Sequence, residues 1–158
     1  MRRTVVLLAV MAAVLVMASG VALAVNKVGT NGRDVLLGTA KADNLIGRGG
    51  NDVLFGDRRS DNIVGGEGND LLIDGDLREG ARDKLVGGDG NDLIDVINRP
   101  AVQDVVVCGD GFDRVFADRK DQVAPDCERV FVGLGSADAL FASIPGSFFR
   151  GLPPNPFI

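Results

Sequence analysis

Aspartate residues recur every nine positions through the middle of this 158-residue chain. Five keep strict register and two resume it after an insertion: Asp34, Asp43, Asp52, Asp61, Asp70, Asp83 and Asp92. An apolar residue follows each aspartate at the second position, and glycine-rich sequence precedes most of them. A unit this short cannot bury its own hydrophobic side chain, so the copies must stack on one another as a solenoid. Stacking aligns the aspartates into columns of carboxylate, and such columns need cations.

Composition favours a metal ion as the partner over nucleic acid or anionic lipid. Residues 1–24 carry two of the 17 Lys and Arg residues and none of the 22 Asp and Glu, so the rest of the chain has a net charge of −7. An acidic chain without Trp or Tyr, whose basic residues are interspersed among aspartates, is a poor candidate for binding polyanions. A divalent metal is a better candidate, and calcium is abundant outside the cell.

The first 24 residues have the features of a secretory signal peptide. Arg2 and Arg3 precede an unbroken apolar run from Val5 to Met17, and Ala22-Leu23-Ala24 fits the small-x-small rule for cleavage. We therefore expect cleavage there, a secreted or cell-surface protein, and no membrane insertion afterwards. An uncleaved anchor is the alternative, because the uncharged stretch from Thr4 to Ala24 is nearly long enough to span a membrane.

Three loops share one consensus of glycine, asparagine and aspartate: Gly47-Arg48-Gly49-Gly50-Asn51-Asp52, Gly65-Gly66-Glu67-Gly68-Asn69-Asp70 and Gly87-Gly88-Asp89-Gly90-Asn91-Asp92. Gly29–Asp34 and Cys108–Asp113 are weaker copies. These loops resemble the G-G-x-G-x-D-x-U-x nonapeptide of the RTX, or hemolysin-type, calcium-binding repeat family of secreted bacterial proteins. One match would mean little, but several in register are a strong signal.

The resemblance implies an all-β fold, a right-handed parallel β-roll (β-solenoid) with two repeats in each turn. It implies several Ca²⁺ ions held between loops of successive turns, by aspartate side chains and by backbone carbonyls that glycine allows to turn inward. The candidate metal residues are Asp34, Gly49, Gly50, Asp52, Gly66, Gly68, Asp70, Gly88, Gly90, Asp92, Gly111 and Asp113. The apolar residues would form a narrow core, namely Leu36, Leu45, Leu54, Ile63, Leu72, Leu85, Ile94, Val106, Val115, Val123 and Val130.

Two repeats in each turn give the roll two edges, and the loops at these edges differ. On the first edge, glycine stands two residues before each aspartate: Gly32, Gly50, Gly68, Gly90 and Gly111. On the second edge, the loops ending at Asp43, Asp61, Asp83 and Asp104 carry a residue with a Cβ there, which resists a left-handed turn. Insertions at Gly75–Arg82 and Asn98–Gln103 also fall on this edge. We predict one good calcium column, on the first edge; whether the second edge binds calcium or only caps turns stays open.

The outward strand positions predict one sheet that is apolar on both sides. After first-edge loops these positions are Val35, Leu37, Val53, Phe55, Leu71, Ile73 and Leu93, whereas after second-edge loops they include Asn44, Asn62 and Lys84. An apolar face of this size implies a cover or a partner. The first candidate is the non-repeat tail, residues 131–158, as a cap, although the tail could also be disordered. A homodimer and a cell-surface partner are the alternatives.

Cys108 and Cys127 lie 19 residues apart, about one turn of the roll. Stacked strands are about 4.8 Å apart, which is within the Cα separation that a disulfide accepts. In an exported chain we expect the two to be bridged. The bridge would clamp the C-terminal end of the roll, which we place at residues 25–130.

An enzyme is hard to support, because the chain has no His and a narrow roll offers no cleft for a carboxylate pair. We expect a secreted calcium-ion-binding protein that folds on binding Ca²⁺, since metal binding pays for ordering the glycine-rich loops. The alternative is an extracellular structural or adhesion scaffold. In that case calcium is only structural, and the apolar face or the tail binds a partner.

Overall fold

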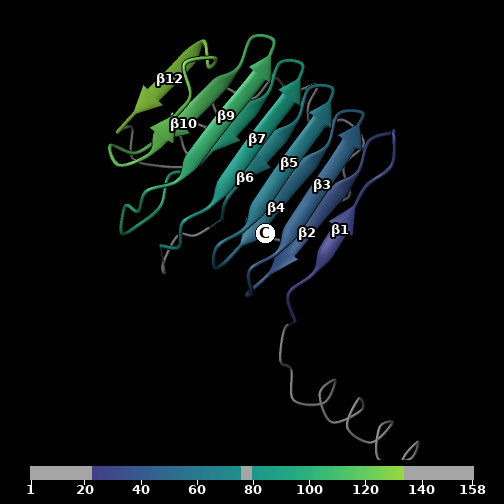
Figure 1. Ribbon diagram of the computed structural model, residues 1–158, viewed down its shortest axis with the longest axis horizontal. Helices are drawn as coiled ribbons and strands as arrows, with labels where there is room; N and C mark the ends of the chain where they lie inside the picture. Colours follow the sequence, from purple (N-terminus) through teal and green to yellow (C-terminus); the bar gives the residue numbers. More distant parts are fainter. Residues whose placement is uncertain (1–22, 76–79, 134–158) are drawn as a thin grey trace, which may run out of the picture.

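The described part of the chain, residues 23–75 and 80–133 of a computed structural model, consists of short strands (Figure 1). The strands are β1 (Asn26–Val28), β2 (Val35–Thr39), β3 (Asn44–Gly49), β4 (Val53–Asp57), β5 (Asn62–Glu67), β6 (Leu71–Ile73), β7 (Lys84–Asp89), β8 (Leu93–Asp95), β9 (Val105–Asp110), β10 (Arg114–Ala117), β11 (Gln122–Val123) and β12 (Arg129–Val132). Within these residues no helix is long and apolar enough to cross a membrane. The predicted signal peptide and most of the predicted tail lie outside them.

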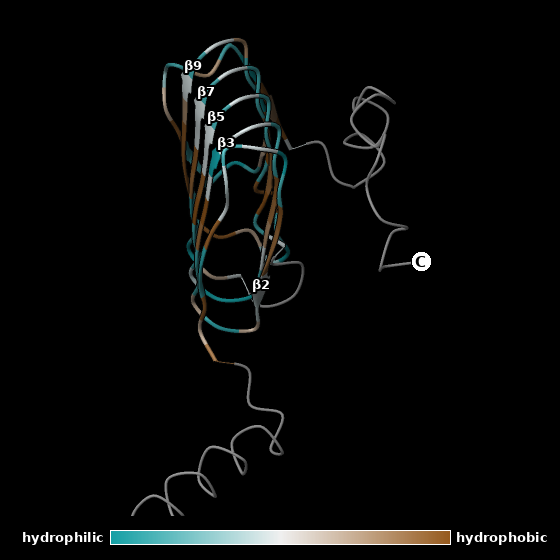
Figure 2. Ribbon diagram, turned by 90° about the vertical axis from the view of Figure 1, so that its right-hand side faces the viewer, coloured by the Kyte–Doolittle hydropathy of each residue, from teal (hydrophilic) through white to brown (hydrophobic). Residues whose placement is uncertain are grey.

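The strands form two parallel sheets of six, between which the chain alternates. The odd sheet has the order β1-β3-β5-β7-β9-β11, and the even sheet runs β2-β4-β6-β8-β10-β12. Figure 2 shows the two sheets as two facing layers joined by loops at both edges. The fold is therefore the parallel β-roll that the repeats predict. First-edge loops lead from odd strands to even strands, and second-edge loops lead back.

The register of the sheets follows the sequence period. Leu36 pairs with Leu54 and Leu54 with Leu72, 18 residues apart, so that one turn takes two nonapeptides. Leu72 then pairs with Ile94, because the connection between β6 and β7 is longer. That extra length lies on the second edge, as expected from the Gly75–Arg82 insertion. The first-edge loops therefore stay in register through the whole roll.

The core is a column of aliphatic side chains between the sheets. Fully buried members that the sequence predicts are Leu45, Leu54, Ile63, Leu72, Leu85, Ile94, Val106 and Val115, and Val96, Cys108 and Ala117 join them. Burying each large aliphatic side chain contributes on the order of 2 kcal/mol. Leu36 and Val123 are partly buried against this core. Val130, predicted to belong to it, is 40% exposed, because β12 is the last strand of the even sheet.

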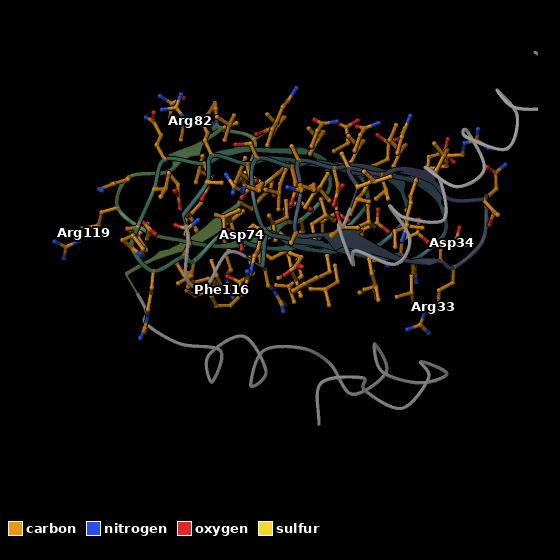
Figure 3. All side chains as sticks on the ribbon, turned by 90° about the horizontal axis from the view of Figure 1, so that it is seen from below. Arg33, Asp34, Asp74, Arg82, Phe116 and Arg119 are labelled. Atoms are coloured by element: carbon orange, nitrogen blue, oxygen red, sulfur yellow. A yellow bond between two sulfur atoms is a disulfide. The ribbon has the colours of Figure 1, made fainter. Side chains whose placement is uncertain are left out.

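The even sheet is apolar on its outer face as well, as predicted. Leu71, Leu93 and Phe116 form a buried cluster there, which we call the outer apolar cluster. Val53, Ile73, Ile97 and Phe131 pack against it, and the rings of Phe116 and Phe131 stack with centroids 5.0 Å apart. Figure 3 shows Phe116 outside the two layers and Asp74 between them.

The outer face of the odd sheet is mixed. One column of it is polar: the Asn44 side-chain amide donates to Asn26 Oδ1 at 2.8 Å, and that of Asn62 donates to Asn44 Oδ1 at 2.6 Å. Lys84 continues this column, since it pairs with Asn62. The next outward column is aliphatic, with Ile46 pairing with Val64. The outer face of the odd sheet therefore has one polar column, whereas the outer face of the even sheet is apolar.

The first-edge loops stack so closely that glycine is required for two reasons. Gly68 and Gly90 have φ values of 124° and 139°, in the left-handed region. A Cβ on Gly90 would lie 1.9 Å from the carbonyl oxygen of Gly68, and one on Gly68 would lie 2.1 Å from that of Gly50. Gly32 was expected to match them, but it lacks the left-handed conformation, and a Cβ there would meet nothing closer than Thr30 Oγ1 at 3.8 Å. The first loop is thus different from those stacked after it.

We therefore expect Gly90→Ala to lower the free energy of unfolding by more than about 2 kcal/mol, because alanine must both adopt a left-handed backbone and displace a carbonyl. Gly32→Ala is the matched control and should change the same free energy by less than about 0.5 kcal/mol. Denaturant unfolding in saturating calcium measures both. Equal losses in the two variants would contradict this account of the stacked loops.

Candidate metal centre

A continuous carboxylate column runs along the first edge. The backbone N–H of each aspartate donates to Oδ1 of the aspartate one turn further on: Asp34 to Asp52 at 2.7 Å, Asp52 to Asp70 at 2.7 Å, Asp70 to Asp92 at 2.8 Å and Asp92 to Asp113 at 2.7 Å. The four acceptor side chains are buried. The sequence register thus places the predicted aspartates in direct succession inside the roll.

The second oxygen of each acceptor has no protein partner. Oδ2 of Asp52, Asp70, Asp92 and Asp113 is buried and accepts no hydrogen bond. A buried carboxylate oxygen left without a partner costs several kcal/mol at least, and native structures contain few such groups without an ion or a water. Each of these atoms is therefore available as a ligand for a cation.

Beside Oδ2 of Asp52, Asp70 and Asp92, the first glycine of the loop leaves room for a carbonyl oxygen of the next turn. A Cβ placed on Gly65 would lie 2.3 Å from Asp70 Oδ2 and 2.6 Å from the carbonyl oxygen of Gly87, one turn on. At Gly47 the corresponding distances are 2.4 Å to Asp52 Oδ2 and 2.4 Å to the carbonyl oxygen of Gly65. Carboxylate and carbonyl oxygens are the mixed donor set that calcium accepts. The residues present therefore fit a calcium ion.

No group of three or more Asp, Glu, His or Cys side chains converges as a metal site within residues 23–75 and 80–133. Sites in the column must therefore combine carboxylates with backbone carbonyls. The glycines at the first position of each loop, Gly47, Gly65 and Gly87, were not among the predicted metal residues. Their invariance across the three best loops could have singled them out.

The predicted loop glycines lie on the outer side of the same edge. The N–H groups of Gly50, Gly68 and Gly90 donate to the third residue of the next loop, at 2.8, 2.7 and 2.7 Å. Gly49, Gly50 and Gly68 also line an open depression, together with Asn31, Arg48 and Glu67. The second-position glycines Gly66 and Gly88, and Gly111 in the last loop, have positive φ and stack on the preceding turn. These residues shape the loops around the aspartate column.

An asparagine column beside the aspartates was not predicted. The N–H of Asn69 donates to Asn51 Oδ1 at 2.9 Å, that of Asn91 to Asn69 Oδ1 at 2.7 Å, and that of Phe112 to Asn91 Oδ1 at 2.9 Å. The repeated Gly-Asn-Asp triplet was its signal in the sequence. Each neutral side-chain oxygen accepts a backbone N–H of the next turn, so this column links successive loops without needing an ion.

Asp34, at the start of the first-edge column, differs from the other predicted metal aspartates. Both the N–H and the hydroxyl of Thr30 donate to its Oδ2. On the second edge, Thr39 makes the same two bonds to Asp43. Threonine at the second loop position therefore adds a hydroxyl donor to Oδ2 in the first turn, whereas Arg48, Gly66 and Gly88 occupy that position in the next first-edge loops.

The second edge has a similar column of hydrogen bonds. The N–H groups of Asp43, Asp61 and Asp83 donate to Oδ1 of the aspartate one turn on, at 2.7, 2.6 and 2.8 Å. Asp57 and Arg59 adopt φ values of 84° and 71°, so their Cβ atoms do not prevent the left-handed turn. The expectation that a residue with a Cβ resists the left-handed turn was therefore wrong for the loop ending at Asp61. Stacking on neighbouring turns outweighs the conformational preference of these residues.

An inserted amide distinguishes the C-terminal half of the second edge. The Asn98 side-chain N–H group donates to Asp74 Oδ2 at 3.1 Å and to Asp104 Oδ2 at 2.8 Å, and all three side chains are buried. Burial, with Asp104, Asp83 and Asp95 nearby, raises the pKa of Asp74 well above its ordinary value. The Asn98–Gln103 insertion thus brings a neutral donor to the second-edge carboxylates.

Burial and neighbouring carboxylates weaken the acidity of the first-edge column. Burial raises the pKa of Asp70 and of Asp92 to about 7, against the hydrogen bond that each accepts, and the adjacent aspartates raise it further. The pKa of Asp52 and of Asp113 is also raised, again chiefly by burial. Around neutral pH the carboxyl groups of Asp70 and Asp92 can therefore bind either a proton or a metal ion.

Parallel strands, glycine loops and a buried carboxylate column together define a metal-binding repeat solenoid. The family model described as the RTX calcium-binding nonapeptide repeat matches residues 28–58, 55–76 and 79–96, in four copies. The segment from residue 28 to residue 96 therefore consists of RTX calcium-binding nonapeptide repeats, as its loops indicated. No curated protein and no solved structure matches it. The hydrogen-bonded column itself continues past residue 96, to Asp113.

Without metal, stability should depend on pH through Asp70 and Asp92. Their pKa is raised to about 7 from an unfolded value of 3.8, so the folded state binds these protons more tightly. The resulting stabilisation is complete below pH 3.8 and is lost as the pH rises through about 7. In chelator, we therefore expect the roll to keep more β structure at pH 5 than at pH 8, where both carboxylates are ionised and the roll depends on a metal ion.

Far-ultraviolet circular dichroism at the two pH values measures the fall in β structure, with Asp70→Asn as the matched control. Asparagine does not titrate, so the fall should be smaller in that variant. A metal-free protein that becomes more stable from pH 5 to pH 8 would contradict the assignment.

Proposed function

We propose that the protein is secreted and that its roll folds when Ca²⁺ binds between the stacked first-edge loops. The observation that supports this is the series of buried Oδ2 atoms from Asp52 to Asp113 that accept no hydrogen bond. Ionised together, these carboxylates repel one another, and the glycine-rich loops add a large entropy cost to ordering. Binding of several calcium ions would offset both the repulsion and the entropy cost. Metal binding would then be coupled to folding.

The first-edge residues have different roles in this proposal. Asp52, Asp70, Asp92 and Asp113 supply carboxylate oxygens, and Gly65 and Gly87 supply carbonyl oxygens next to them. Most of the predicted glycines hold the loops in the left-handed conformation, namely Gly50, Gly66, Gly68, Gly88, Gly90 and Gly111. Asp34 contributes less, since Thr30 already partners its Oδ2.

Secretion rests on the signal-peptide features of residues 1–24, and export to an oxidising compartment agrees with the Cys108–Cys127 disulfide. We propose no catalytic role, because the chain has no His and the RTX repeat is a structural calcium-binding unit. The domain division is then a signal peptide (1–24), the β-roll (25–130, with β12 extending to Val132) and a tail.

Calcium titration from excess chelator, followed by far-ultraviolet circular dichroism, tests the proposal. We expect a cooperative transition to β structure with Ca²⁺ and none with the same concentration of Mg²⁺. Replacing Asp52 and Asp70 together by asparagine should raise the calcium midpoint at least about tenfold, because two adjacent ligands lose their charge. The control pair Asp43→Asn and Asp61→Asn lies on the second edge and should shift it less. A protein fully folded in chelator at pH 8, where the carboxylates are ionised, would contradict calcium-dependent folding.

The outer apolar cluster favours a second candidate function, an extracellular scaffold that binds a partner through the even sheet. Val35 and Leu37 extend this face with 43% and 37% exposure. Residues 134–158, the predicted cover, lie outside the described residues. A second copy of the chain or a cell-surface partner would need the face to be accessible.

We expect the scaffold, if it acts through a second copy, to be a dimer whose dissociation constant rises at least tenfold in Leu37→Asp. Sedimentation equilibrium in calcium measures this. Val28→Asp is the matched control, because Val28 is 47% exposed on the odd sheet. A monomer that also fails to bind a hydrophobic dye would count against the scaffold and would favour a cover supplied by the chain itself.

A further inference from the structure

The first-edge column ends at a site that the RTX repeats do not supply. Asp113 is fully buried, its Oδ1 accepts the N–H of Asp92, and its Oδ2 accepts no hydrogen bond. This orphaned oxygen has the same need for a positive partner as those at Asp52, Asp70 and Asp92. The family match stops at residue 96, however, and no nonapeptide loop follows one turn on.

Glu128 takes the place of the next aspartate. The N–H of Asp113 donates to Glu128 Oε2 at 2.9 Å, which continues the hydrogen-bonded column. The strand register agrees, since Arg114 pairs with Arg129 and Val115 with Val130. Sequence analysis missed Glu128 because it is not an aspartate, although Val130 follows it at the usual spacing. A carboxylate therefore stands one turn beyond Asp113.

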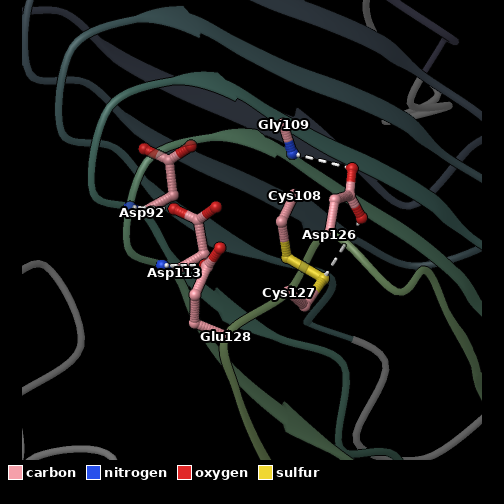
Figure 4. Close-up of a disulfide and its surroundings, with 7 residues drawn as sticks. All are labelled: Asp92, Cys108, Gly109, Asp113, Asp126, Cys127 and Glu128. Carbon is pink, nitrogen blue, oxygen red and sulfur yellow. Dashed lines mark hydrogen bonds between the residues drawn. A yellow bond between two sulfur atoms is a disulfide. The ribbon is translucent and has the colours of Figure 1, made fainter.

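Asp126 and the disulfide hold this carboxylate against the last loop (Figure 4). Asp126 Oδ2 accepts the N–H of Gly109 at 3.1 Å, and Cys127 is bonded to Cys108, with the two Cα atoms 5.2 Å apart. Cys108 occupies the loop position at which Gly47, Gly65 and Gly87 stand in earlier turns. Each residue of the segment Asp126–Glu128 thus contacts the loop Cys108–Asp113, and one of the contacts is covalent.

We propose that a calcium ion binds between the loop Cys108–Asp113 and the segment Asp126–Glu128, with Asp113 Oδ2 and the Glu128 carboxylate as side-chain ligands. Asp126 adds negative charge beside the ion, and backbone carbonyl oxygens and water complete the shell. The disulfide does here what stacked glycine loops do elsewhere, because it fixes the distance between the two ligand-bearing segments. The proposal rests on the proposed function for the identity of the ion.

The site should therefore respond to reduction, unlike the sites between the RTX repeats. Breaking the Cys108–Cys127 bond frees the segment that carries Glu128, so the two carboxylates are no longer held together. A ligand pair that must be ordered on binding has lower affinity than a preorganised pair. Sites at Asp52 and Asp70 lie between repeat loops that contain no cysteine, and they should keep their affinity.

The number of calcium ions bound by the full chain, measured by equilibrium dialysis against radioactive calcium, tests the proposal. We expect Glu128→Gln to bind one ion fewer than the unchanged protein. The matched control is Glu67→Gln, because Glu67 is an exposed first-edge side chain outside the aspartate column, and it should bind the full number. Reduction of the unchanged protein should also remove one ion, and reduction of Glu128→Gln should remove no more.

The possible outcomes distinguish failure of this terminal site from failure of the proposed function. If the unchanged protein binds no calcium, the proposed function fails and this inference with it. If that protein binds calcium, and both Glu128→Gln and the reduced protein keep the full number of ions with unchanged affinity, only the terminal site is overturned. If Glu128→Gln does not show the native circular dichroism spectrum, the reduced protein decides, since reduction alters no ligand.

Discussion

Repulsion between stacked carboxylates is the constraint on which the rest of the structure depends. In a parallel roll, equivalent residues of successive turns lie about 4.8 Å apart. For leucine and asparagine this spacing is favourable, and both form continuous columns here. For aspartate it brings together like charges that repel by about 3 kcal/mol per neighbouring pair at an effective dielectric constant near 20. The same regularity that builds the core therefore creates a need for cations.

The roll meets this need in different ways at different places. Thr30 and Thr39 donate to the carboxylates of the first turn, and Asn98 donates to two carboxylates on the second edge. In the interior first-edge loops the second position holds Arg48, Gly66 or Gly88 in place of threonine, and Oδ2 of the aspartate that ends the loop is buried and accepts no hydrogen bond. These loops therefore lack the hydroxyl donor that threonine supplies in the first turn. That combination selects an external ion as the partner.

The period of the sequence predicted the features for which each residue needs an equivalent residue in the turn before it and in the turn after it. The sheet register, the core from Leu45 to Val115 and the Cys108–Cys127 bond follow from an 18-residue turn. Predictions were wrong where that symmetry ends: Val130 is exposed, and Gly32 lacks the left-handed turn. Conformations set by stacking, such as those of Asp57 and Arg59, could not be deduced from residue type alone. Glu128 was missed because it supplies a carboxylate, as the repeat aspartates do, but is a different residue type.

A column of ion sites must also end, and its two ends are built differently. At the N-terminal end, the N–H and the hydroxyl of Thr30 both donate to Oδ2 of Asp34, so that oxygen has partners within the chain. At the C-terminal end, Asp113 keeps an unbonded oxygen and meets two further carboxylates, at Glu128 and Asp126. Placing more negative charge beside an unsatisfied carboxylate destabilises a metal-free end and stabilises one that holds a cation. The covalent clamp at Cys108 and Cys127 lies where this repulsion would otherwise push the last turn away from the roll.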